Sequence, residues 1–398
     1  MGLIKPIYRI ITFSLLLILL ILTGCKEPAT PQLYNRQIDS LSDIWVPDMR
    51  EGLCNAEMTL TEGKLVLKGL TSIPEAKSAI LNFLDSKNVK FLDNFRVIPD
   101  TNEIKEPWGL INVSVCNIRR TQNHDAEMVT QALMGTPVKI FIEDDGWYQI
   151  QTPDSYIGWI DSEAVITISV NKYYLWRRSE RIIFLGKTAD VYSGIDENGV
   201  VSDVVAGAIL QKKSEVSGGY QVILPDGREG FLKKKDCMEF SSWAAEARPE
   251  ANKILKTALR FMGTPYLWGG TSVKGMDCSG FIKTVYFLNG LILARDASLQ
   301  AKHGFQIKDF RNRKSLMPGD LLFFGWTAGD NPKPSHVGMY IGNTEFVHES
   351  GMVKINSLDS TRKNFSRYRH DSFLGARRII GQEPGPGLET VSGNPWYF

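Results

Sequence analysis

The chain has 398 residues, of which 43% are hydrophobic, 23% charged and 10% aromatic. This is more than one hydrophobic core usually serves, so we expect roughly two to four folded domains and no wholesale disorder. The formal net charge is +2, and the only short basic run is Lys233-Lys234-Lys235. Binding to nucleic-acid phosphates needs a broader basic surface, so the charge argues against a nucleic-acid partner.

The N-terminus has the features of an export signal. Lys5 and Arg9 precede an apolar stretch of 13 residues, 10–22, which is shorter than the roughly 20 residues that span a bilayer. The following Leu22-Thr23-Gly24-Cys25 resembles the processing box of bacterial lipoproteins. We predict that residues 1–24 are a signal peptide and that Cys25 is lipidated. The protein would then be exported and anchored to a bacterial membrane, on its periplasmic face or at the cell surface. The alternative is an ordinary cleaved signal followed by an incidental cysteine.

The next two segments carry no evident chemistry. Residues 25–36 contain Pro28 and Pro31 and are interpreted as a tether. Residues 37–104 are predicted to be a helical N-terminal segment, because Pro74 begins a stretch with apolar spacing near 3.6. Cys54 and Cys116 could form a disulfide in an exported protein, and buried free thiols are the alternative.

An internal repeat defines the two domains that follow. Tyr148, Pro153 and Gly158 recur 72 residues later as Tyr220, Pro225 and Gly230, around a Pro-Asp turn in each copy. Alternating strand residues around such a turn predict hairpins, and copies of this size suit small β-barrels. The stretches resemble bacterial SH3 domains, the first more closely than the second. We place the two SH3-like domains at 105–168 and 169–240.

The candidate nucleophile lies in the third domain, predicted at 241–385, with a loose tail at 386–398. A helix is predicted over 243–262, where Leu255, Ala258, Leu259 and Met262 follow helical spacing. A second helix is predicted to begin near Cys278. A thiol at a helix N-terminus is expected to have a lowered pKa, as a nucleophile requires. A buried structural cysteine is the alternative.

Two of the five histidines favour a nucleophilic Cys278 over a structural one. His336 and His348 bracket a predicted hairpin that turns near Gly342 and Asn343. A turn centred on Gly342 places the histidines opposite each other, and one centred on Asn343 places them diagonally. In both registers they share one face of the sheet, whereas a two-residue turn would separate them. Two imidazoles on one face suggest a general base and its orienting partner. A His/His/Cys zinc site was the less favoured alternative, because no water-activating carboxylate pattern accompanies it.

The motifs of this domain resemble those of the NlpC/P60 peptidases. They are Asp277-Cys278-Ser279-Gly280-Phe281, then Ser335-His336-Val337-Gly338, then Val347-His348-Glu349-Ser350. The resemblance covers about 140 residues and implies an α+β fold with a papain-like catalytic domain. It also implies that Cys278 is the nucleophile, His336 the general base and acid, and His348 the orienting residue. Tyr266 would assist the oxyanion hole together with the backbone N–H of Cys278, and a packed aromatic is the alternative for this residue. Trp268 would form a wall of the site.

The whole chain resembles a subgroup with SH3 domains before the peptidase, the γ-D-glutamyl-L-diamino acid endopeptidases. That resemblance implies cleavage of cell-wall peptides, or murein peptides, that carry a free N-terminal L-Ala. Glu127 and Tyr156 would then contact the substrate ammonium from the first SH3-like domain, and Asp277 and Ser279 from beside the nucleophile. A solvated surface acid is the plain alternative for Glu127.

The sequence leaves two other functions open. One is an endopeptidase that acts on intact, glycan-linked peptidoglycan, and the other is a non-catalytic wall-binding lipoprotein. No cofactor and no metal are expected, and a monomer is the default expectation.

Overall fold

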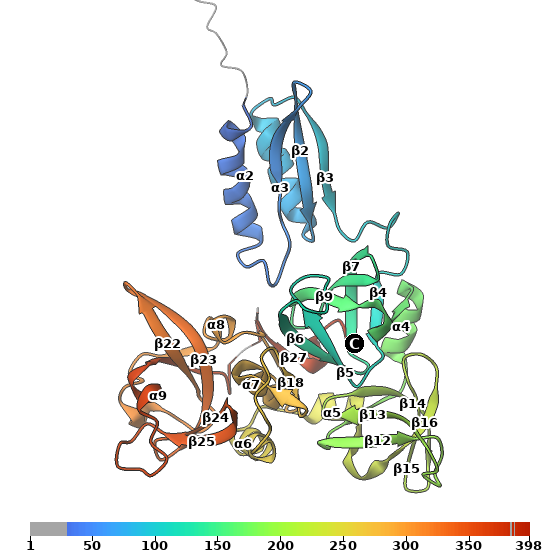
Figure 1. Cartoon of the computed structure of the whole chain (residues 1–398), viewed down its shortest axis with the longest axis vertical. Helices are drawn as coiled ribbons and strands as arrows, with labels where there is room; N and C mark the ends of the chain where they lie inside the picture. The colour runs from blue at the N-terminus through green and yellow to red at the C-terminus, as the bar shows by residue number, and fades with distance from the viewer. Residues whose placement is uncertain (1–29, 383, 386) are drawn as a thin grey trace, which may run out of the picture. The chain divides into compact units, whose positions relative to one another are not determined.

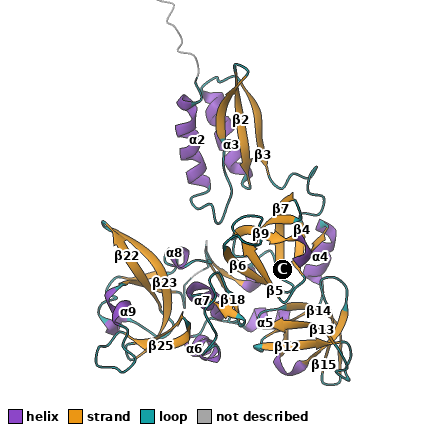
Figure 2. Ribbon diagram, viewed as in Figure 1, coloured by secondary structure: helices purple, strands orange, loops and turns teal. Residues whose placement is uncertain are grey.

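The computed structural model describes residues 30–382, 384–385 and 387–398 (Figures 1 and 2). The predicted signal peptide and Cys25 lie outside these residues. The described chain forms two compact units. One contains the residues up to Pro47 together with Cys54–Val97, and the other contains Asp48–Leu53 and Ile98–Phe398.

The first unit contains a β-sheet that the sequence did not predict. Among its described residues, two helices accompany a three-stranded sheet of order β1-β2-β3. The expectation of a mostly helical segment is therefore wrong. One helix does begin at Pro74 as expected, and it links the parallel strands β2 and β3. The core of this unit includes Ile38, Leu67, Ile80 and Phe95. The elements are α2 (Gln32–Trp45), β1 (Glu57–Thr61), β2 (Lys64–Thr71), α3 (Pro74–Ser86) and β3 (Phe91–Val97).

The 72-residue repeat is present in the structure as two sheets of the same topology. The first sheet has the order β10-β4-β7-β8-β9-β5-β6, and the second has the matching order β17-β11-β14-β15-β16-β12-β13. Each is an open seven-stranded arrangement in which the predicted Pro-Asp turn joins two antiparallel strands. The first sheet consists of β4 (Trp108–Ile111), β5 (Val115–Arg119), β6 (Met128–Leu133), β7 (Pro137–Asp144), β8 (Trp147–Gln151), β9 (Ile157–Asp161) and β10 (Val165–Ile168). The second consists of β11 (Arg181–Phe184), β12 (Thr188–Tyr192), β13 (Val200–Val205), β14 (Ile209–Val216), β15 (Gly219–Ile223), β16 (Glu229–Lys233) and β17 (Cys237–Glu239).

The two sheets meet at a glycine. Gly135 has φ +76°, and a Cβ atom there would lie 1.7 Å from the carbonyl oxygen of Ile209 in the second sheet. Only glycine permits this close approach without strain. The short helices around the two sheets are η1 (Ser162–Ala164), α4 (Val170–Arg178), η2 (Lys234–Asp236) and α5 (Phe240–Glu246).

The third domain packs helix α7 against a six-stranded antiparallel sheet of order β21-β26-β22-β23-β24-β25. The buried residues Phe281 and Val285 of α7 contact a core that includes Val337 and Val347 of the sheet. The elements are α6 (Ala251–Arg260), β18 (Thr271–Ser272), β19 (Gly275–Met276), α7 (Cys278–Phe287), β20 (Leu291–Leu293), α8 (Ala297–Gln300), β21 (Phe305–Ile307), η3 (Arg313–Ser315), β22 (Leu321–Ala328), β23 (Asn331–Gly342), β24 (Glu345–Ser350), β25 (Met352–Ser357), α9 (Arg367–Asp371) and β26 (Phe373–Arg378).

Two expectations for this domain are wrong. The helix predicted over 243–262 is split into α5 and α6, because Pro249 lacks the backbone N–H that a continuous helix would need. The buried face of α6 carries Ile254 and Ala258, whereas Leu259 and Met262 are exposed. The tail is not loose. Strand β27 (Leu388–Thr390) pairs with β20, η4 (Val391–Gly393) follows it, and Tyr397 is buried.

The described cysteines are all free thiols. Cys54, Cys116, Cys237 and Cys278 form no disulfide with one another, so the proposed Cys54–Cys116 bridge is absent. Buried free thiols, the alternative, describe Cys54 and Cys116.

Candidate active site

Cys278 is the first residue of helix α7, where the sequence predicted a helix to begin. Asp277 caps that helix, since its Oδ1 accepts a hydrogen bond of 2.7 Å from the backbone N–H of Gly280. The apolar face of α7 fixes the helix on the sheet, and the thiol is thereby held at the helix start, 7% exposed.

The two histidines face each other as the diagonal register predicted. His348 lies opposite Gly338 in the β23–β24 pair, so His336 is two residues further along the same face. The two side chains are in contact, with 2.8 Å between Nε2 of His336 and Nδ1 of His348. Pairing in the sheet therefore brings together two imidazoles that are 12 residues apart.

A chain of hydrogen bonds assigns the tautomers of this pair. The Nδ2 group of Asn356 donates to the backbone carbonyl of Asn364 at 2.9 Å, which orients the amide. Its Oδ1 atom lies 2.8 Å from Nε2 of His348, so this nitrogen carries the proton. Nδ1 of neutral His348 must then accept a hydrogen bond from Nε2 of His336. The remaining nitrogen of neutral His336, Nδ1, keeps a lone pair and is the atom available as a base.

The thiol does not have the lowered pKa that the helix N-terminus suggested. Burial and the neighbouring Asp277 carboxylate raise the pKa of Cys278 to about 11. These two effects outweigh the lowering of the pKa that the helix N-terminus was expected to cause. Burial also lowers the pKa of His348 to about 4 and that of His336 well below its usual value. The resting pair is therefore a neutral thiol and a neutral imidazole.

Asp277 is held by a buried arginine that the sequence analysis overlooked. Arg295 is fully buried and donates to both carboxylate oxygens of Asp277, at 3.1 and 2.5 Å. The same guanidinium donates to Ser279 at 2.9 Å and to Thr130, in the first repeat, at 2.8 Å. Asp277 also accepts from the backbone N–H of Gly269. Much of the hydrogen-bonding capacity expected to face a substrate ammonium is therefore used within the protein.

A cavity of about 280 Å³ extends from Cys278 towards the first repeat. Glu127 and Tyr156 from that repeat line it together with Asp277 and Ser279, so the structure brings these four predicted residues together. Other lining residues include Arg50, Arg120, Tyr266, Trp268, Asp296 and Ser298.

Glu127 joins the two domains at the cavity wall. Its Oε1 accepts a hydrogen bond of 2.9 Å from the indole of Trp268, and its Oε2 forms an ion pair of 2.7 Å with Arg120. These two hydrogen bonds lower the pKa of the Glu127 carboxyl, that with Arg120 contributing more. Trp268 thus lines this cavity and holds Glu127 through its indole N–H.

A second acid in the cavity, Asp296, was not singled out from the sequence. Its Oδ2 accepts hydrogen bonds from the Tyr156 hydroxyl at 3.1 Å and from Arg50 at 2.6 Å. Arg50 also donates to Ser298 and forms an ion pair with Asp48. Only the Arg-Asp-Ala-Ser motif at 295–298 could have indicated Asp296. No pattern pointed to Arg50, which reaches the site from the segment Asp48–Leu53.

On its other side, Cys278 borders a second cavity of about 410 Å³. Tyr266, Ser335 and His336 line it, and so do Glu349 and Arg369. Burial and the nearby Cys278 raise the pKa of the Tyr266 hydroxyl, which therefore stays protonated and can donate a hydrogen bond. Burial raises the pKa of Glu349 to about 7.

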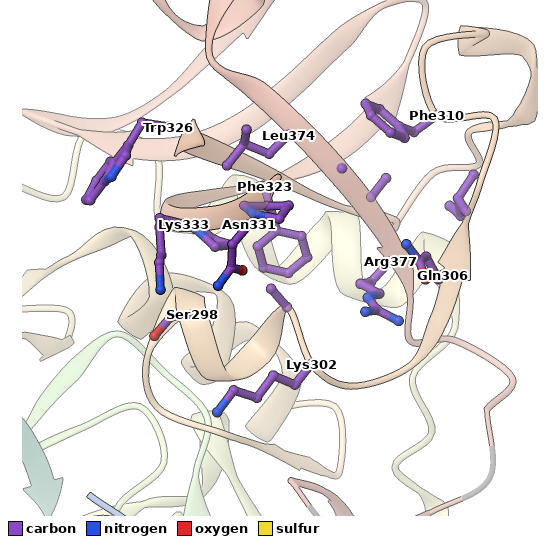
Figure 3. Close-up of a pocket in the computed structure, with 16 residues that line it drawn as sticks. Ser298, Lys302, Gln306, Phe310, Phe323, Trp326, Asn331, Lys333, Leu374 and Arg377 are labelled. Atoms are coloured by element: carbon purple, nitrogen blue, oxygen red, sulfur yellow. The ribbon is translucent and has the colours of Figure 1, made fainter. Parts of the chain in front are cut away.

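A larger cavity, of about 610 Å³, lies beside the site between α8 and the strands β22, β23 and β26 (Figure 3). It presents the cationic residues Lys302, Lys333 and Arg377 around the apolar Phe323. Ser298 and Pro334 line both this cavity and the one that extends to Glu127. None of Cys278, His336 and His348 lines it, so it is not the catalytic centre.

Among the residues that the structure describes, no group of three or more His, Cys, Asp or Glu side chains is placed to hold a metal ion. The helices described here include none that is both long and apolar enough to cross a membrane.

Comparison with known proteins identifies the catalytic domain. The model of the NlpC/P60 family matches residues 263–377, and that of the bacterial dipeptidyl-peptidase SH3 domain matches residues 118–165. A γ-D-glutamyl-L-lysine dipeptidyl-peptidase of Bacillus cereus is 30% identical over 265 residues, which cover 64% of this chain and 76% of that protein. The chain belongs to the NlpC/P60 family. It is a cysteine peptidase with an SH3 domain before its catalytic domain.

Two further comparisons extend over a similar part of the chain. Dipeptidyl-peptidase 6 of Lysinibacillus sphaericus is 29% identical over 273 residues, which are 66% of this chain and 95% of that protein. The crystal structure of an NlpC/P60 protein from Bacillus cereus has a TM-score of 0.58 at 24% identity and covers 68% of this chain and 99% of its own. This likeness shows that the fold is shared.

Proposed function

We propose that this NlpC/P60 peptidase hydrolyses the bond between γ-D-Glu and the diamino acid of murein peptides that carry a free N-terminal L-Ala. The single observation that carries the proposal is the cavity between Cys278 and the first repeat, which is lined by Glu127 and Asp296. Two relatives are named γ-D-glutamyl-L-lysine dipeptidyl-peptidase and dipeptidyl-peptidase 6, and the activity proposed here is the one that the first of these names describes.

The carboxylates of the cavity favour an ammonium group beside Glu127 and Asp296. Glu127 keeps Oε1 on the side of Trp268, away from the Arg120 ion pair. The side-chain hydrogen bonds of Asp296 with the described residues all involve Oδ2, which leaves Oδ1 for a ligand. An ammonium placed there would gain ion pairs with the Glu127 and Asp296 carboxylates, whereas an acetylated amine carries no charge and would lose those ion pairs. Tyr156 and Ser279 would complete the pocket, and Asp277 would mainly position Ser279 through Arg295.

Catalysis would follow from the hydrogen-bond chain that ends at Nδ1 of His336. This nitrogen takes the proton of the Cys278 thiol as Sγ attacks the γ-carbonyl carbon of D-Glu. The Tyr266 hydroxyl and the backbone N–H of Cys278 would stabilise the oxyanion. The imidazolium, held by His348, then gives its proton to the leaving amine, and a thioester remains. Water, deprotonated by His336, attacks the thioester, releases L-Ala-D-Glu and restores the thiol.

The proposal is tested with the purified full-length chain in detergent and the peptide L-Ala-γ-D-Glu-meso-diaminopimelate. Its N-acetylated form and the variant Cys278→Ala are assayed in parallel. We expect release of L-Ala-D-Glu by the parent only, with the acetylated peptide spared. Cleavage of both peptides would keep the triad but refute the free-amine requirement, and would indicate intact peptidoglycan as substrate. Absence of any cleavage would refute the proposed activity.

A pair of variants isolates the ammonium pocket. Glu127→Gln removes a carboxylate from the cavity wall, and we expect it to raise KM for the free-amine peptide. Glu163→Gln is the matched control, because Glu163 is an exposed acid of the same domain that does not line the cavity. An equal KM in both variants would show that Glu127 does not contribute to substrate binding.

The attachment to a membrane is a separate proposal. Cys25, in the Leu22-Thr23-Gly24-Cys25 box, would carry the lipid and hold the peptidase at a bacterial membrane. More than one acyl chain is needed for a firm anchor, because one chain binds only marginally. Two measurements test this. Mass spectrometry of the chain from bacterial membranes should detect a lipid on Cys25. The variant Cys25→Ala should release the protein into the soluble fraction. We also propose that the second repeat is a degenerate SH3-like domain and that the protein acts as a monomer.

A further inference from the structure

Arg369 lies in the wall of the cavity on the far side of Cys278. It belongs to α9 and lines the cavity of about 410 Å³ together with Cys278 and His336. This cavity and the one lined by Glu127 share Tyr266, Cys278 and Ser335. The two cavities therefore meet at the nucleophile. If the Ala-Glu part of a substrate occupies the first, the leaving residue must enter the second.

The guanidinium of Arg369 has no acidic partner among the residues described. Its polar contact is a long one, 3.5 Å from Nη2 to the Ser350 hydroxyl. Its planar group lies over the rings of Tyr368 and Phe324, with centroid distances of 5.0 and 5.8 Å. Burial lowers the pKa of Arg369, so the charged form is desolvated in this wall. A partly buried cation of this kind is costly unless an anion pairs with it.

The acid nearest in the cavity does not supply that anion. Glu349 lines the same cavity, yet neither of its carboxylate oxygens has a hydrogen-bond partner in the described part of the chain. The other buried guanidinium of the site, that of Arg295, is paired with Asp277. Arg369 thus differs from Arg295 in having its fork of donors available, and such a fork matches the geometry of a carboxylate.

We propose that Arg369 binds a carboxylate of the leaving diamino acid and is a specificity-determining residue of this peptidase. The inference rests on the proposed cleavage between γ-D-Glu and the diamino acid. Two carboxylates have the required chemistry. One is the α-carboxylate of a diamino acid at the end of a tripeptide, and the other is the second carboxylate that diaminopimelate has and lysine lacks.

Three peptides separate these two sources. They are L-Ala-γ-D-Glu-L-Lys, its C-terminal carboxamide, and the α-carboxamide of L-Ala-γ-D-Glu-meso-diaminopimelate, which keeps only the second carboxylate. A hydrogen bond to a charged group contributes about 1.5–3 kcal/mol. We therefore expect the lysine carboxamide to have a kcat/KM roughly 10- to 100-fold below at least one of the other peptides. A preference for the free lysine peptide assigns the α-carboxylate, and a preference for the diaminopimelate amide assigns the second one.

The variant Arg369→Gln should abolish this preference while the lysine carboxamide is still cleaved. Arg367→Gln is the matched control, because Arg367 lies on the same helix, is exposed, pairs with Asp371 and is absent from the cavity wall. A structural role over Tyr368 and Phe324 would lower kcat/KM for all three peptides by the same factor, which would overturn the proposal.

Equal cleavage of the three peptides by the parent chain would also overturn the proposal. This measurement does not depend on whether Arg369→Gln folds. It would leave the proposed function intact. Failure of the parent chain on all three peptides would instead refute the proposed function, and with it this inference.

Discussion

Asn356 is the residue whose removal tests the tautomer assignment most directly. Its Oδ1 accepts a hydrogen bond of 2.8 Å from the Nε2–H of His348. This contact sets the direction of the next hydrogen bond, from Nε2 of His336 to Nδ1 of His348. In the variant Asn356→Ala, His348 loses that acceptor, and its proton is free to move to Nδ1. His348 could then no longer accept from His336, so the base would lose its orientation.

The magnitude follows from the charge that develops during the reaction. His336 becomes an imidazolium when it takes the thiol proton, and the chain through His348 to Asn356 stabilises that charge. Loss of a hydrogen bond to a charged group costs about 1.5–3 kcal/mol, so kcat/KM should fall roughly 10- to 100-fold. The effect should lie in kcat, since Asn356 lines neither cavity beside Cys278.

The assay is steady-state cleavage of L-Ala-γ-D-Glu-meso-diaminopimelate, with the melting temperature measured alongside. Asn364→Ala is the matched control. Its backbone carbonyl still holds the Asn356 amide, and the contacts of its own side chain with Glu345 and with the Ile355 carbonyl are lost. If Asn356→Ala kept kcat within about twofold of the parent while remaining folded, the tautomer chain would have no catalytic role and the reasoning would be refuted.

Three further predictions follow from burial and charge. Alkylation of Cys278 by iodoacetamide should still be accelerating at pH 9, because the thiol pKa is raised to about 11; a rate that levels off below pH 7 would contradict this. Glu349→Gln should raise the melting temperature by a few degrees at pH 8 and little at pH 4.5. The folded carboxyl ionises only near pH 7 against a usual value of 4.5, so the stability of the parent falls as pH rises between these values. An equal shift at both pH values would exclude this cause. Arg295→Met should destabilise the catalytic domain by about 3–5 kcal/mol in urea unfolding, because Asp277 would be left buried without its partner. A change below about 1 kcal/mol would show that Asp277 is solvated.

Local patterns in the sequence were sufficient for the parts of the site that lie close together in the chain. The helix start at Cys278 and the hairpin that carries His336 and His348 follow from apolar spacing and from a turn, and both are present. The repeat at an offset of 72 residues is likewise visible in aligned residues, because each copy must bury the same face. The structure also selected one of the two registers that the sequence left open.

Long-range packing decided what the sequence could not. The strands of the first unit and the packed tail depend on pairing with other strands, in the case of β27 with the distant β20. The split of α5 from α6 depends on competition between local preferences. The pKa of Cys278 is set by burial, which no spacing reveals, and burial reverses the effect expected of the helix end.

The contrast is sharpest in the substrate cavity. Sequence motifs indicated Glu127 and Tyr156, but Arg50 and Asp296 meet there across 246 positions of the chain. Residue type and the neighbouring residues in the sequence indicate which groups can ionise, donate a hydrogen bond or act as a nucleophile. Which of them are paired, buried or left open to a ligand is a property of tertiary contacts, because a carboxylate held by an arginine and one that faces a cavity are identical in the sequence.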